Sequence, residues 1–269
     1  MSAPAGGDGG GAAAAAVPAR VPAPASPSSV PLTDDRVPDA VLALMRAFQD
    51  DPVAHYVLLR APVDFPRALA TFYACALRYQ YGQSGGLAAH CLIMPDGRGA
   101  ALWQRDSGAS PGPRAGIGPI QQLQLLPHLG SLCGWGPRAI TRLIRLATVV
   151  DAAHARVCGG RAHYYLGVLG VDPICQGRSY ATRLLAPVLA RADAEGTLCY
   201  LESSKASNIP IYERFGFKLV EVVGAWEGRL SDADAAAAAR DGSGRGRVVD
   251  ASGAPLLWVM RREPALPKL

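Results

Sequence analysis

The sequence predicts an α/β fold in which strands and helices alternate within one packed domain. Between residues 164 and 219, an apolar strand, a glycine-containing turn, a helix, a second apolar strand and a short helix follow one another. Earlier in the chain, the apolar segments 87–94 and 99–103 flank Pro95-Asp96-Gly97, which is typical of a hairpin turn. The apolar fraction of 49% and the charged fraction of 18% are those of a globular protein.

The folded domain is expected to cover residues 34–269, behind a disordered tail at residues 1–33. The first 31 residues are almost entirely Ala, Gly, Pro and Ser, with no aromatic residue. Such a segment buries too little apolar surface to offset the entropy lost on ordering. Residues 30–33 make a poor first strand. The tail has no secretory apolar core, but its shortage of acidic residues leaves organelle targeting open.

Two helices are expected before the hairpin. Residues 37–50 carry apolar residues at helical spacing, and an acidic pair followed by Pro52 ends that helix. Residues 64–81 show the same spacing, and the Asp64 side chain can cap their first turn. After the hairpin, residues 106–119 are rich in Gly, Pro and Ser and are expected to form a loop. Two more helices are expected, at residues 120–129 and 137–154.

The second half has a clearer pattern. The expected elements are the strand 164–171, the helix 179–194, the strand 198–203, the helix 209–214 and the strands 217–223 and 256–262. Pro187 lies inside the longer helix, where it removes one backbone hydrogen bond and favours a kink. A low-complexity insert rich in Ala and Gly, residues 228–253, separates the last two strands.

Charge and composition narrow the classes of ligand. The net charge of +5 and the pI of about 9.0 suit an anionic ligand. The basic residues are dispersed, so no nucleic-acid partner is expected, although the arginine-containing run 244–247 keeps an RNA-contacting segment as the alternative to a solvated loop. No segment is apolar and long enough to span a membrane.

The cysteines and histidines indicate neither disulfides nor a metal. Six cysteines include no Cys-x-x-Cys pair, and several lie in apolar runs, as buried free thiols do. A reducing, cytoplasmic location is therefore expected. The five histidines show no metal-binding spacing, so no metal is predicted.

The turn after the strand 164–171 has the properties of an anion site. A helix N-terminus offers unpaired N–H groups and a positive dipole end, which bind phosphate groups. Gly177 lets the backbone approach a ligand closely, and Arg178 adds positive charge. The turn is neither a P-loop nor a Gly-x-Gly-x-x-Gly fingerprint. A plain strand-to-helix connection is the alternative.

These segments resemble the core of the GNAT-type N-acetyltransferases. The family signature is Gln/Arg-x-x-Gly-x-Gly/Ala after a Val-x-Pro strand end. Gln176 and Ala181 match it, and Val171-Asp172-Pro173 precedes it. Ser179 replaces the first glycine, and its Cβ crowds the pyrophosphate site. The resemblance implies that acetyl-coenzyme A contacts the strand end and the turn, namely Leu169, Gly170, Val171, Gln176, Gly177, Arg178, Ser179, Tyr180 and Ala181.

A second motif, at residues 208–217, is similar to the family's N-x-x-x-Y-E-x-x-G-F without a departure. The resemblance implies that Tyr212 donates a proton to the departing thiolate. A phenol suits that role because it stays protonated at neutral pH. The alternative is a tyrosine packed in the core with its hydroxyl bonded. Asn208 is implied to contact the cofactor, with a plain helix cap as its alternative.

Glu202 is the candidate general base. An amine must be unprotonated before it attacks a thioester, and Glu202 lies on the strand 198–203, where its side chain can point into a cleft between two splayed central strands. A water relay and an exposed glutamate are the alternatives.

The resemblance covers residues 37–262 and implies a GNAT-like fold, with a mixed, mostly antiparallel central sheet flanked by helices and with splayed central strands. It is greatest to the small-molecule branch that includes puromycin N-acetyltransferase, through the segments 47–52 and 200–204. The implied function is direct, acetyl-coenzyme A-dependent acetyl transfer to the amine of a small molecule, by a monomer or homodimer. A protein N-terminus or lysine is the alternative acceptor. A non-catalytic acyl-coenzyme A binder or interaction module is the alternative of another class.

Overall fold

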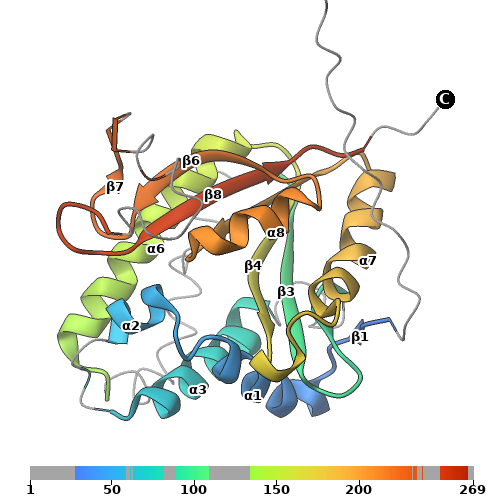
Figure 1. The fold of residues 1–269 in the computed structure, drawn as a ribbon, viewed down its shortest axis with the longest axis horizontal. Coiled ribbons are helices and arrows are strands. Elements are labelled where there is room, and N and C mark those ends of the chain that lie inside the picture. The colour runs from blue at the N-terminus through green and yellow to red at the C-terminus, as the bar shows by residue number, and fades with distance from the viewer. Residues whose placement is uncertain are drawn as a thin grey trace, which may run out of the picture.

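One eight-stranded sheet organises the chain (Figure 1). The computed structural model describes residues 28–58, 61, 63–81, 89–108, 134–231, 233–234, 238 and 249–265. The strand order is β1-β2-β3-β4-β5-β8-β6-β7. The strands are β1 Val30–Pro31, β2 Leu92–Ile93, β3 Gly99–Asp106, β4 His163–Val171, β5 Leu198–Ser203, β6 Lys218–Gly224, β7 Gly228–Arg229 and β8 Leu256–Arg262.

All neighbouring strands are antiparallel except β4 and β5, which run parallel. The mixed, mostly antiparallel sheet implied by the resemblance is therefore confirmed. The parallel pair lies at the centre of the sheet, and its connection runs through α7, because parallel strands need a crossover.

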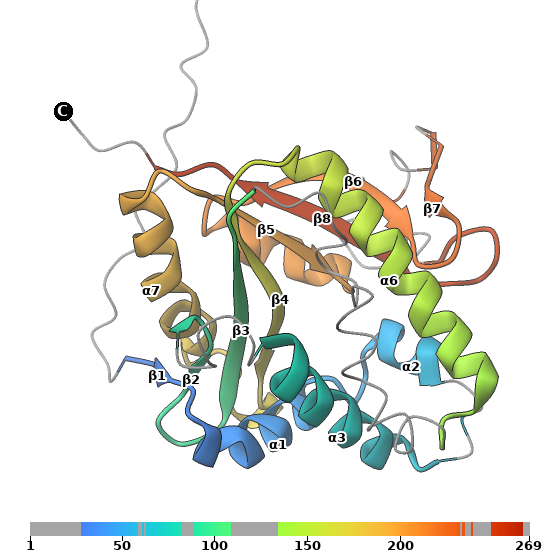
Figure 2. The ribbon, with the colours of Figure 1, turned by 180° about the vertical axis from the view of Figure 1, so that it is seen from behind.

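Helices cover both faces of this sheet. They are α1 Val37–Ala47, α2 Pro52–Leu58, α3 Phe65–Cys75, α6 Gly136–Cys158, α7 Tyr180–Ala194 and α8 Ile209–Glu213. One buried cluster joins α7 and α8 to β4 and β5, and another joins α6 to the opposite side of these strands. Figure 1 shows α8 in front of the strands, whereas Figure 2, from behind, shows α6 and α3 in front. No helix in the described part of the chain is long and apolar enough to cross a membrane.

Local sequence explains several helix ends. The Asp64 carboxylate accepts the backbone N–H of Arg67 at 3.3 Å, so the expected cap of α3 is confirmed. Beyond Cys75 the chain continues as a π-helical segment, Ala76–Tyr81, instead of the regular helix expected up to residue 81. Gly159, with φ +57°, ends α6, because glycine enters the left-handed region without the strain of a Cβ.

The folded part begins earlier than expected. Val30 and Pro31 form the edge strand β1 beside Ile93 and Leu92, and Leu32 is fully buried. The tail boundary at residue 33 was therefore wrong, because apolar residues around a proline can pair at a sheet edge that needs few backbone donors. Residues 1–27 lie outside the described residues, as do the expected loop 109–119 and helix 120–129.

The ends of the low-complexity insert belong to the sheet. Gly228–Arg229 form β7 against β6, and Ala238 is buried in a cluster with Val222 and Trp258. The Asp250 carboxylate, itself buried, accepts the backbone N–H of Glu227 at 3.2 Å and of Ala254 at 2.9 Å. The insert boundary expected at residue 228 is thus too early, since these hydrogen bonds hold both ends of the segment.

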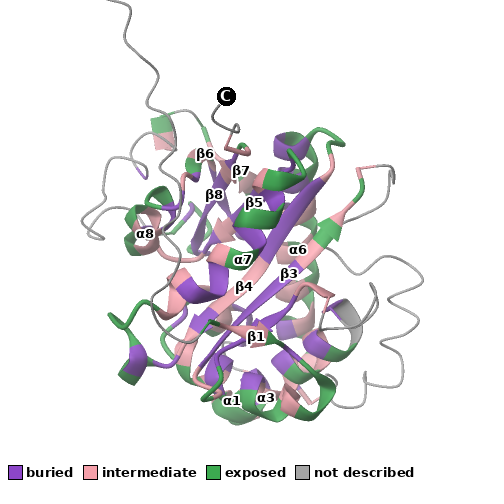
Figure 3. Cartoon of the chain, turned by 90° about the vertical axis from the view of Figure 1, so that its right-hand side faces the viewer, coloured by how far each residue is buried: buried purple, intermediate pink, exposed green. Residues whose placement is uncertain are grey.

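Buried residues concentrate along the central strands, whereas the outer faces of the helices are exposed (Figure 3). Cys91, Cys175 and Cys199 are buried free thiols, as expected, Cys158 is also buried, and Cys75 is half-buried and free. Within the described residues the core therefore depends on packing and not on disulfides.

Candidate active site

The two central strands separate halfway along the sheet. The pairing of β4 with β5 ends at Leu166 and Leu201, although β4 continues to Val171. Beyond this point, here called the fork, the edge of β4 that faces β5 carries backbone groups with no strand partner. The splayed central strands implied by the resemblance are therefore present.

An irregularity in the sheet coincides with the fork. The register of β3 and β4 shifts between Leu102 and Trp103, which pair with Val168 and Leu166. Gly167 is the extra residue of this bulge, so it has no register partner in β3 or in β5. A bulge bends its strand and increases the twist. It therefore helps to direct β4 away from β5.

The expected cofactor residues follow the fork in order. Leu169, Gly170 and Val171 form the end of β4 and pair with β3 through Ala101, Ala100 and Gly99. Their other edge points toward the fork. Gln176, Gly177, Arg178 and Ser179 are exposed, and Tyr180 and Ala181 are half-buried at the start of α7. The structure thus brings these nine residues onto one continuous path from the unpaired strand edge to a helix N-terminus.

Ser179 has an unusual backbone. Its φ of 60° and ψ of 21° place it in the left-handed region, and it is the one non-glycine residue with positive φ in the described part of the chain. A side chain there costs about 1–2 kcal/mol. Position 179 therefore favours glycine for two reasons: its backbone is left-handed, and a Cβ atom there crowds the pyrophosphate site. The Ser179 side chain makes no capping hydrogen bond to α7.

A buried carboxylate holds the turn. Asp172 accepts the Ile174 backbone N–H at 3.2 Å and pairs with Arg46 at 3.1 Å and with Arg98 at 3.3 Å. These bonds tie the end of β4 to α1 and to the hairpin. Two cationic groups therefore stand beside the strand end that leads into the turn.

The first residues of α7 are held from two sides. The Tyr180 hydroxyl donates to Asp96 at 2.5 Å, and this bond, followed by burial, raises the pKa of Tyr180 to about 12. The Arg183 guanidinium lies over the Tyr180 ring at 4.4 Å and donates to the Arg178 carbonyl at 2.6 Å. Arg183 thus braces the turn, while the exposed Arg178 side chain extends from it.

Tyr212 lies on α8 and is buried, with 8% of its surface exposed. It belongs to the same buried cluster as Leu166 and Leu201, the last paired residues before the fork. Burial raises the pKa of its phenol well above the ordinary value. Its hydroxyl makes no hydrogen bond within the described residues. A protonated phenol, without a hydrogen bond to the described residues, therefore lies on the face of the sheet that α7 and α8 cover.

Glu202 is the first residue of β5 beyond the fork. Because side chains alternate along a strand, it shares a face with Tyr200, the face that α6 covers. Burial raises the pKa of its carboxyl to about 7, while the nearby phenols of Tyr200 and Tyr165 oppose the shift. Its Oε1 atom is buried without a hydrogen bond in the described structure. An exposed glutamate is thereby excluded, and a carboxyl that titrates near neutral pH remains.

Asn208 precedes α8 and is half-buried. Its backbone is already helical, with φ −85° and ψ −16°, and its side chain makes no capping bond. The plain helix cap, the alternative for Asn208, is therefore not formed by its side chain. The helix continues a 3-10 turn, Ala206–Asn208, and the Asn208 amide stays available to a ligand.

One contact near the fork escaped sequence reasoning. The Ser204 hydroxyl, just after β5, donates to Asp51 Oδ2. Asp51 Oδ1 accepts the backbone N–H of Val53 at 3.0 Å and of Ala54 at 2.9 Å, and so caps α2. The acidic residue expected to end one helix thus begins the next. It fixes α2 beside the strand that carries Glu202.

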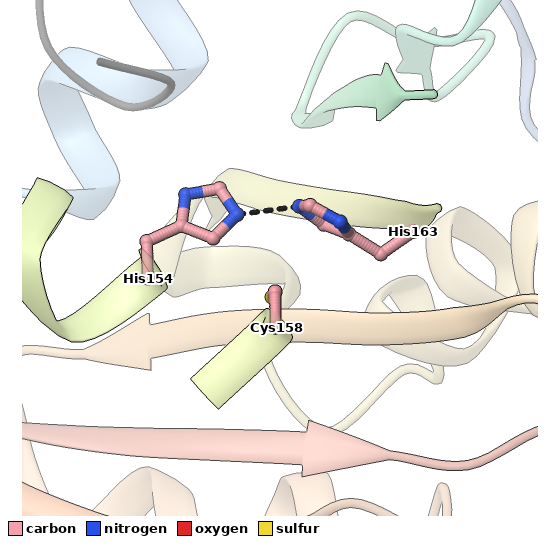
Figure 4. Close-up of side chains that lie close together, drawn as sticks. All are labelled: His154, Cys158 and His163. Atoms are coloured by element: carbon pink, nitrogen blue, oxygen red, sulfur yellow. Dashed lines mark hydrogen bonds between the residues drawn. The ribbon is translucent and has the colours of Figure 1, made fainter. Parts of the chain in front are cut away.

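A group with metal-binding side chains lies away from the fork. His154, Cys158 and His163 are buried, and their ligand atoms lie within 4.8 Å of one another. Sequence spacing missed this group because His163 reaches it from the next strand. Figure 4 shows the imidazoles of His154 and His163 joined by a hydrogen bond between their Nε2 atoms. His163 Nδ1 also lies 2.7 Å from the Arg161 carbonyl oxygen. These bonds pair the rings with protein atoms, and the absence of a metal stays a prediction.

A shallow pocket of about 240 Å³ lies at the far end of the sheet. Its lining is Pro137, Arg138, Thr141, Arg142 and Trp226. The Arg142 guanidinium donates to the Tyr56 carbonyl at 3.0 Å and lies over that ring at 4.8 Å. The described lining holds no carboxylate, cysteine or histidine.

Comparison with known proteins agrees with this geometry. Residues 132–217 match the family model described as the Acetyltransferase (GNAT) family. A curated protein of Schizosaccharomyces pombe, named an uncharacterized N-acetyltransferase, is 46% identical over 54 residues. That match spans 20% of this chain and 22% of the fission-yeast protein.

Solved structures share the whole architecture at low identity. An acetyltransferase of Corynebacterium glutamicum, described as histone acetyltransferase HPA2 and related acetyltransferase, is 22% identical with a TM-score of 0.51. The alignment covers 91% of this chain and 99% of that one. Arylalkylamine N-acetyltransferase 2 of Aedes aegypti is 15% identical, with a TM-score of 0.54 and coverage of 87% and 97%. Polyamine N-acetyltransferase of Drosophila melanogaster is 14% identical, with a TM-score of 0.52 and coverage of 87% and 98%. The chain therefore has the GNAT fold, and its central segment matches the acetyltransferase (GNAT) family.

Proposed function

We propose that this protein is an N-acetyltransferase that transfers the acetyl group of acetyl-coenzyme A directly to an amine. The observation that carries the proposal is the fork itself. A buried phenol, Tyr212, lies on one face of the sheet, and a buried carboxyl, Glu202, lies on the other face of the same opening.

The residues present fit acetyl-coenzyme A as a substrate. The unpaired edge of Leu169–Val171 suits the amide groups of the pantetheine arm, because an extended ligand can add to an open strand edge. The backbone N–H groups of Gly177 and of residues 179–181, at the start of α7, suit the pyrophosphate, whereas that of Arg178 donates to the Cys175 carbonyl at 3.4 Å. Arg178 adds charge there, and the free Asn208 amide lies beside α8, where it can hold the arm.

The chemistry then follows from the two buried groups. Glu202, as a carboxylate, accepts the proton of the attacking amine while the new nitrogen–carbon bond forms. Tyr212 donates its proton to the coenzyme A sulfur while the carbon–sulfur bond breaks. Solvent returns a proton to Tyr212 and removes one from Glu202, so atoms and charges balance. The pKa of about 7 suits Glu202 to its role, because a base works best when its pKa lies near the working pH.

A small-molecule amine is the proposed acceptor. The arylalkylamine and polyamine enzymes that share the fold are named for small amines. Similarity of the segments 47–52 and 200–204 to the puromycin N-acetyltransferase branch points the same way, and the Asp51–Ser204 bond shows that these segments meet beside Glu202. Protein N-termini and lysines form the second candidate class. The cytoplasmic location and the monomeric or dimeric state stay predictions.

A coenzyme A release assay tests the proposal. The purified chain is given acetyl-coenzyme A with panels of small primary amines and of peptides bearing free N-termini or lysines. Amine-dependent release of coenzyme A, lost in Tyr212→Phe, would support the enzyme. Tight binding of acetyl-coenzyme A without turnover on either panel would favour the non-catalytic binder instead.

A further inference from the structure

Tyr81 stands out among the residues that no motif singled out. It ends the π-helical segment Ala76–Tyr81, and such turns are rare and concentrate at functional sites. Only 5% of its surface is exposed, although its ring carries a polar hydroxyl. That hydroxyl makes no hydrogen bond within the described residues. Polar groups in a protein interior are normally paired, so a hydroxyl carried into the core is expected to serve a role.

The hydroxyl of Tyr81 lies at the fork. A Cβ atom built on Gly167 would overlap the Tyr81 oxygen, and the Tyr81 Cζ atom would lie 3.2 Å away. Gly167 is the bulged residue with no strand partner on either side. The absence of a side chain at position 167 therefore makes the space in which the Tyr81 hydroxyl sits, against open backbone.

Glu202 lies opposite Gly167 where the strands separate, because the two residues follow Leu201 and Leu166, the last pair of β5 and β4. Its carboxyl acts electrostatically on the Tyr81 phenol, whose pKa is raised mainly by burial. The other groups around Glu202 are Tyr200 on its own strand, Tyr165 on β4 and Asp151 on α6. Asp151 carries a further charge that acts on Glu202, and it disfavours the carboxylate. The phenols favour the carboxylate. The carboxyl from β5 and the phenol from the π-helical segment thus act on each other electrostatically at the fork.

We propose that Tyr81 is a positioning residue that holds the attacking amine nitrogen between its phenol oxygen and the Glu202 carboxylate. This inference rests on the proposed acetyl transfer. The Tyr81 hydroxyl donates to Glu202 and accepts one N–H of the amine, which fixes the nitrogen lone pair toward the thioester carbon. Tyr81 keeps its proton throughout. The amine proton goes to Glu202, and the thiolate takes its proton from Tyr212.

The geometry is tested without turnover, by thermal unfolding of a double-mutant cycle. Gly167→Ala is expected to lower the melting temperature by roughly 5 °C, because the new methyl group overlaps the Tyr81 hydroxyl. In a Tyr81→Phe background the same change should cost clearly less, since the overlapping oxygen is gone and the nearest remaining ring atom lies at 3.2 Å, a tight contact instead of an overlap. Equal losses in both backgrounds would overturn the placement of Tyr81 at the fork.

The role is tested by kinetics with an amine that the unaltered protein acetylates. Tyr81→Phe is expected to lower kcat/KM for the amine at least tenfold while the Kd for acetyl-coenzyme A stays unchanged. The acid limb of the pH profile should also move to higher pH, because Glu202 loses a donor that favours its charged form. Tyr73→Phe is the matched control, since it removes another buried hydroxyl from the same helix.

The outcomes separate this inference from the proposed function. If Tyr81→Phe matches Tyr73→Phe in kcat/KM and in pH profile, the positioning role is wrong, while acetyl transfer stands. If the unaltered protein acetylates no amine, the proposed function fails and the positioning role falls with it. In that case the double-mutant cycle still decides whether Tyr81 lies at the fork.

Discussion

Glu202 and Tyr212 lie on opposite faces of the central sheet, on either side of the opening between β4 and β5. Glu202 shares its face with Tyr200 and α6, whereas Tyr212 packs in the cluster of α7 and α8. Such an arrangement lets two substrates meet from opposite sides, one along the strand edge and one over Glu202. In the proposed mechanism, the proton donor Tyr212 and the proton acceptor Glu202 are thereby kept apart, so neither neutralises the other.

Replacement of Tyr212 by Phe is expected to reduce kcat roughly 100-fold or more, because a general acid contributes about that factor. Acetyl-coenzyme A should still bind, since the turn and strand edge are unchanged. Steady-state kinetics and calorimetry measure the two effects. Tyr164→Phe serves as the control, because its hydroxyl bonds Glu195 at 3.0 Å, away from the fork. Unchanged turnover in Tyr212→Phe would remove the phenol from the mechanism.

The pH dependence of turnover should report Glu202. Since the carboxylate is the active form and its pKa is raised to about 7, kcat/KM is expected to rise as pH increases through about 7. Glu202→Gln should lower kcat/KM strongly and abolish this limb. If kcat/KM of Glu202→Gln still rises with pH through about 7, the rise belongs to another titrating group, and a water relay is favoured as the base.

The raised pKa of Glu202 should also make the stability of the folded protein depend on pH. Stability should fall over the pH range in which turnover rises. The folded-state pKa of Glu202 lies above the unfolded value of about 4.5, so the folded protein binds the proton more tightly. Its contribution to stability is fully present below about pH 4.5 and is lost as pH rises through about 7, by on the order of 1–3 kcal/mol. Glu202→Gln should therefore gain stability relative to the unaltered protein at pH 8 but not at pH 4.5.

Glu195 provides the contrast in the same unfolding series. Bonds to Arg105 and Tyr164 hold its pKa below the ordinary value, against the opposing effect of burial. It stabilises the fold above its unfolded pKa, and this contribution is lost as pH falls through the lowered folded value. Glu195→Gln should therefore lose stability at pH 8. If the stabilities of Glu202→Gln and Glu195→Gln, relative to the unaltered protein, change with pH in the same direction, the burial of Glu202 is not the cause of its effect.

Ser179→Gly is expected to stabilise the fold and to tighten acetyl-coenzyme A binding. Glycine relieves the left-handed strain at φ 60°, worth about 1 kcal/mol after its entropic cost, and removes the Cβ that crowds the anion site. Unfolding curves and calorimetry measure both effects. Ser179→Ala is the control, because it keeps the Cβ and the strain while removing the hydroxyl. Equal gains in the two variants would show that the hydroxyl, not the backbone, is responsible.

Asp193→Asn should be among the most damaging surface changes. Asp193 holds the fully buried Arg262 through contacts of 2.6 and 2.8 Å, and Arg262 also donates to the Phe215 carbonyl at 2.8 Å. Removing the partner leaves a buried charge uncompensated, at a cost of about 3–5 kcal/mol. Chemical denaturation measures the loss. Asp39→Asn, which breaks the exposed pair with Arg36, is the control and should cost little.

Much of the fold could be predicted because apolar periodicity is strong in the second half. The bounds of β5 and β8 agree with the expectation, and α7 differs by one residue. The short edge strands β1 and β7 could not be predicted, because two residues carry no period. The first is set by pairing with β2 and the second by pairing with β6.

The candidate site, like the fold, could be predicted only in part. Tyr212, Glu202 and the turn 176–181 were found through local motifs. Tyr81 was not, because its meeting with Gly167 joins segments 86 residues apart (167 − 81) and depends on a π-helical turn that propensity does not reveal. The group of His154, Cys158 and His163 was missed for a similar reason, since it joins a helix to the following strand.

Calorimetric titration of acetyl-coenzyme A tests the central claim most directly, with the unaltered protein, Arg178→Glu at the turn and Arg138→Glu on the distant start of α6. We predict one-site micromolar binding by the unaltered protein and by Arg138→Glu. In Arg178→Glu the affinity for acetyl-coenzyme A should be at least tenfold weaker. No binding by the folded, unaltered protein would contradict an acetyl-coenzyme A site at the fork, and with it the proposed acetyl transfer.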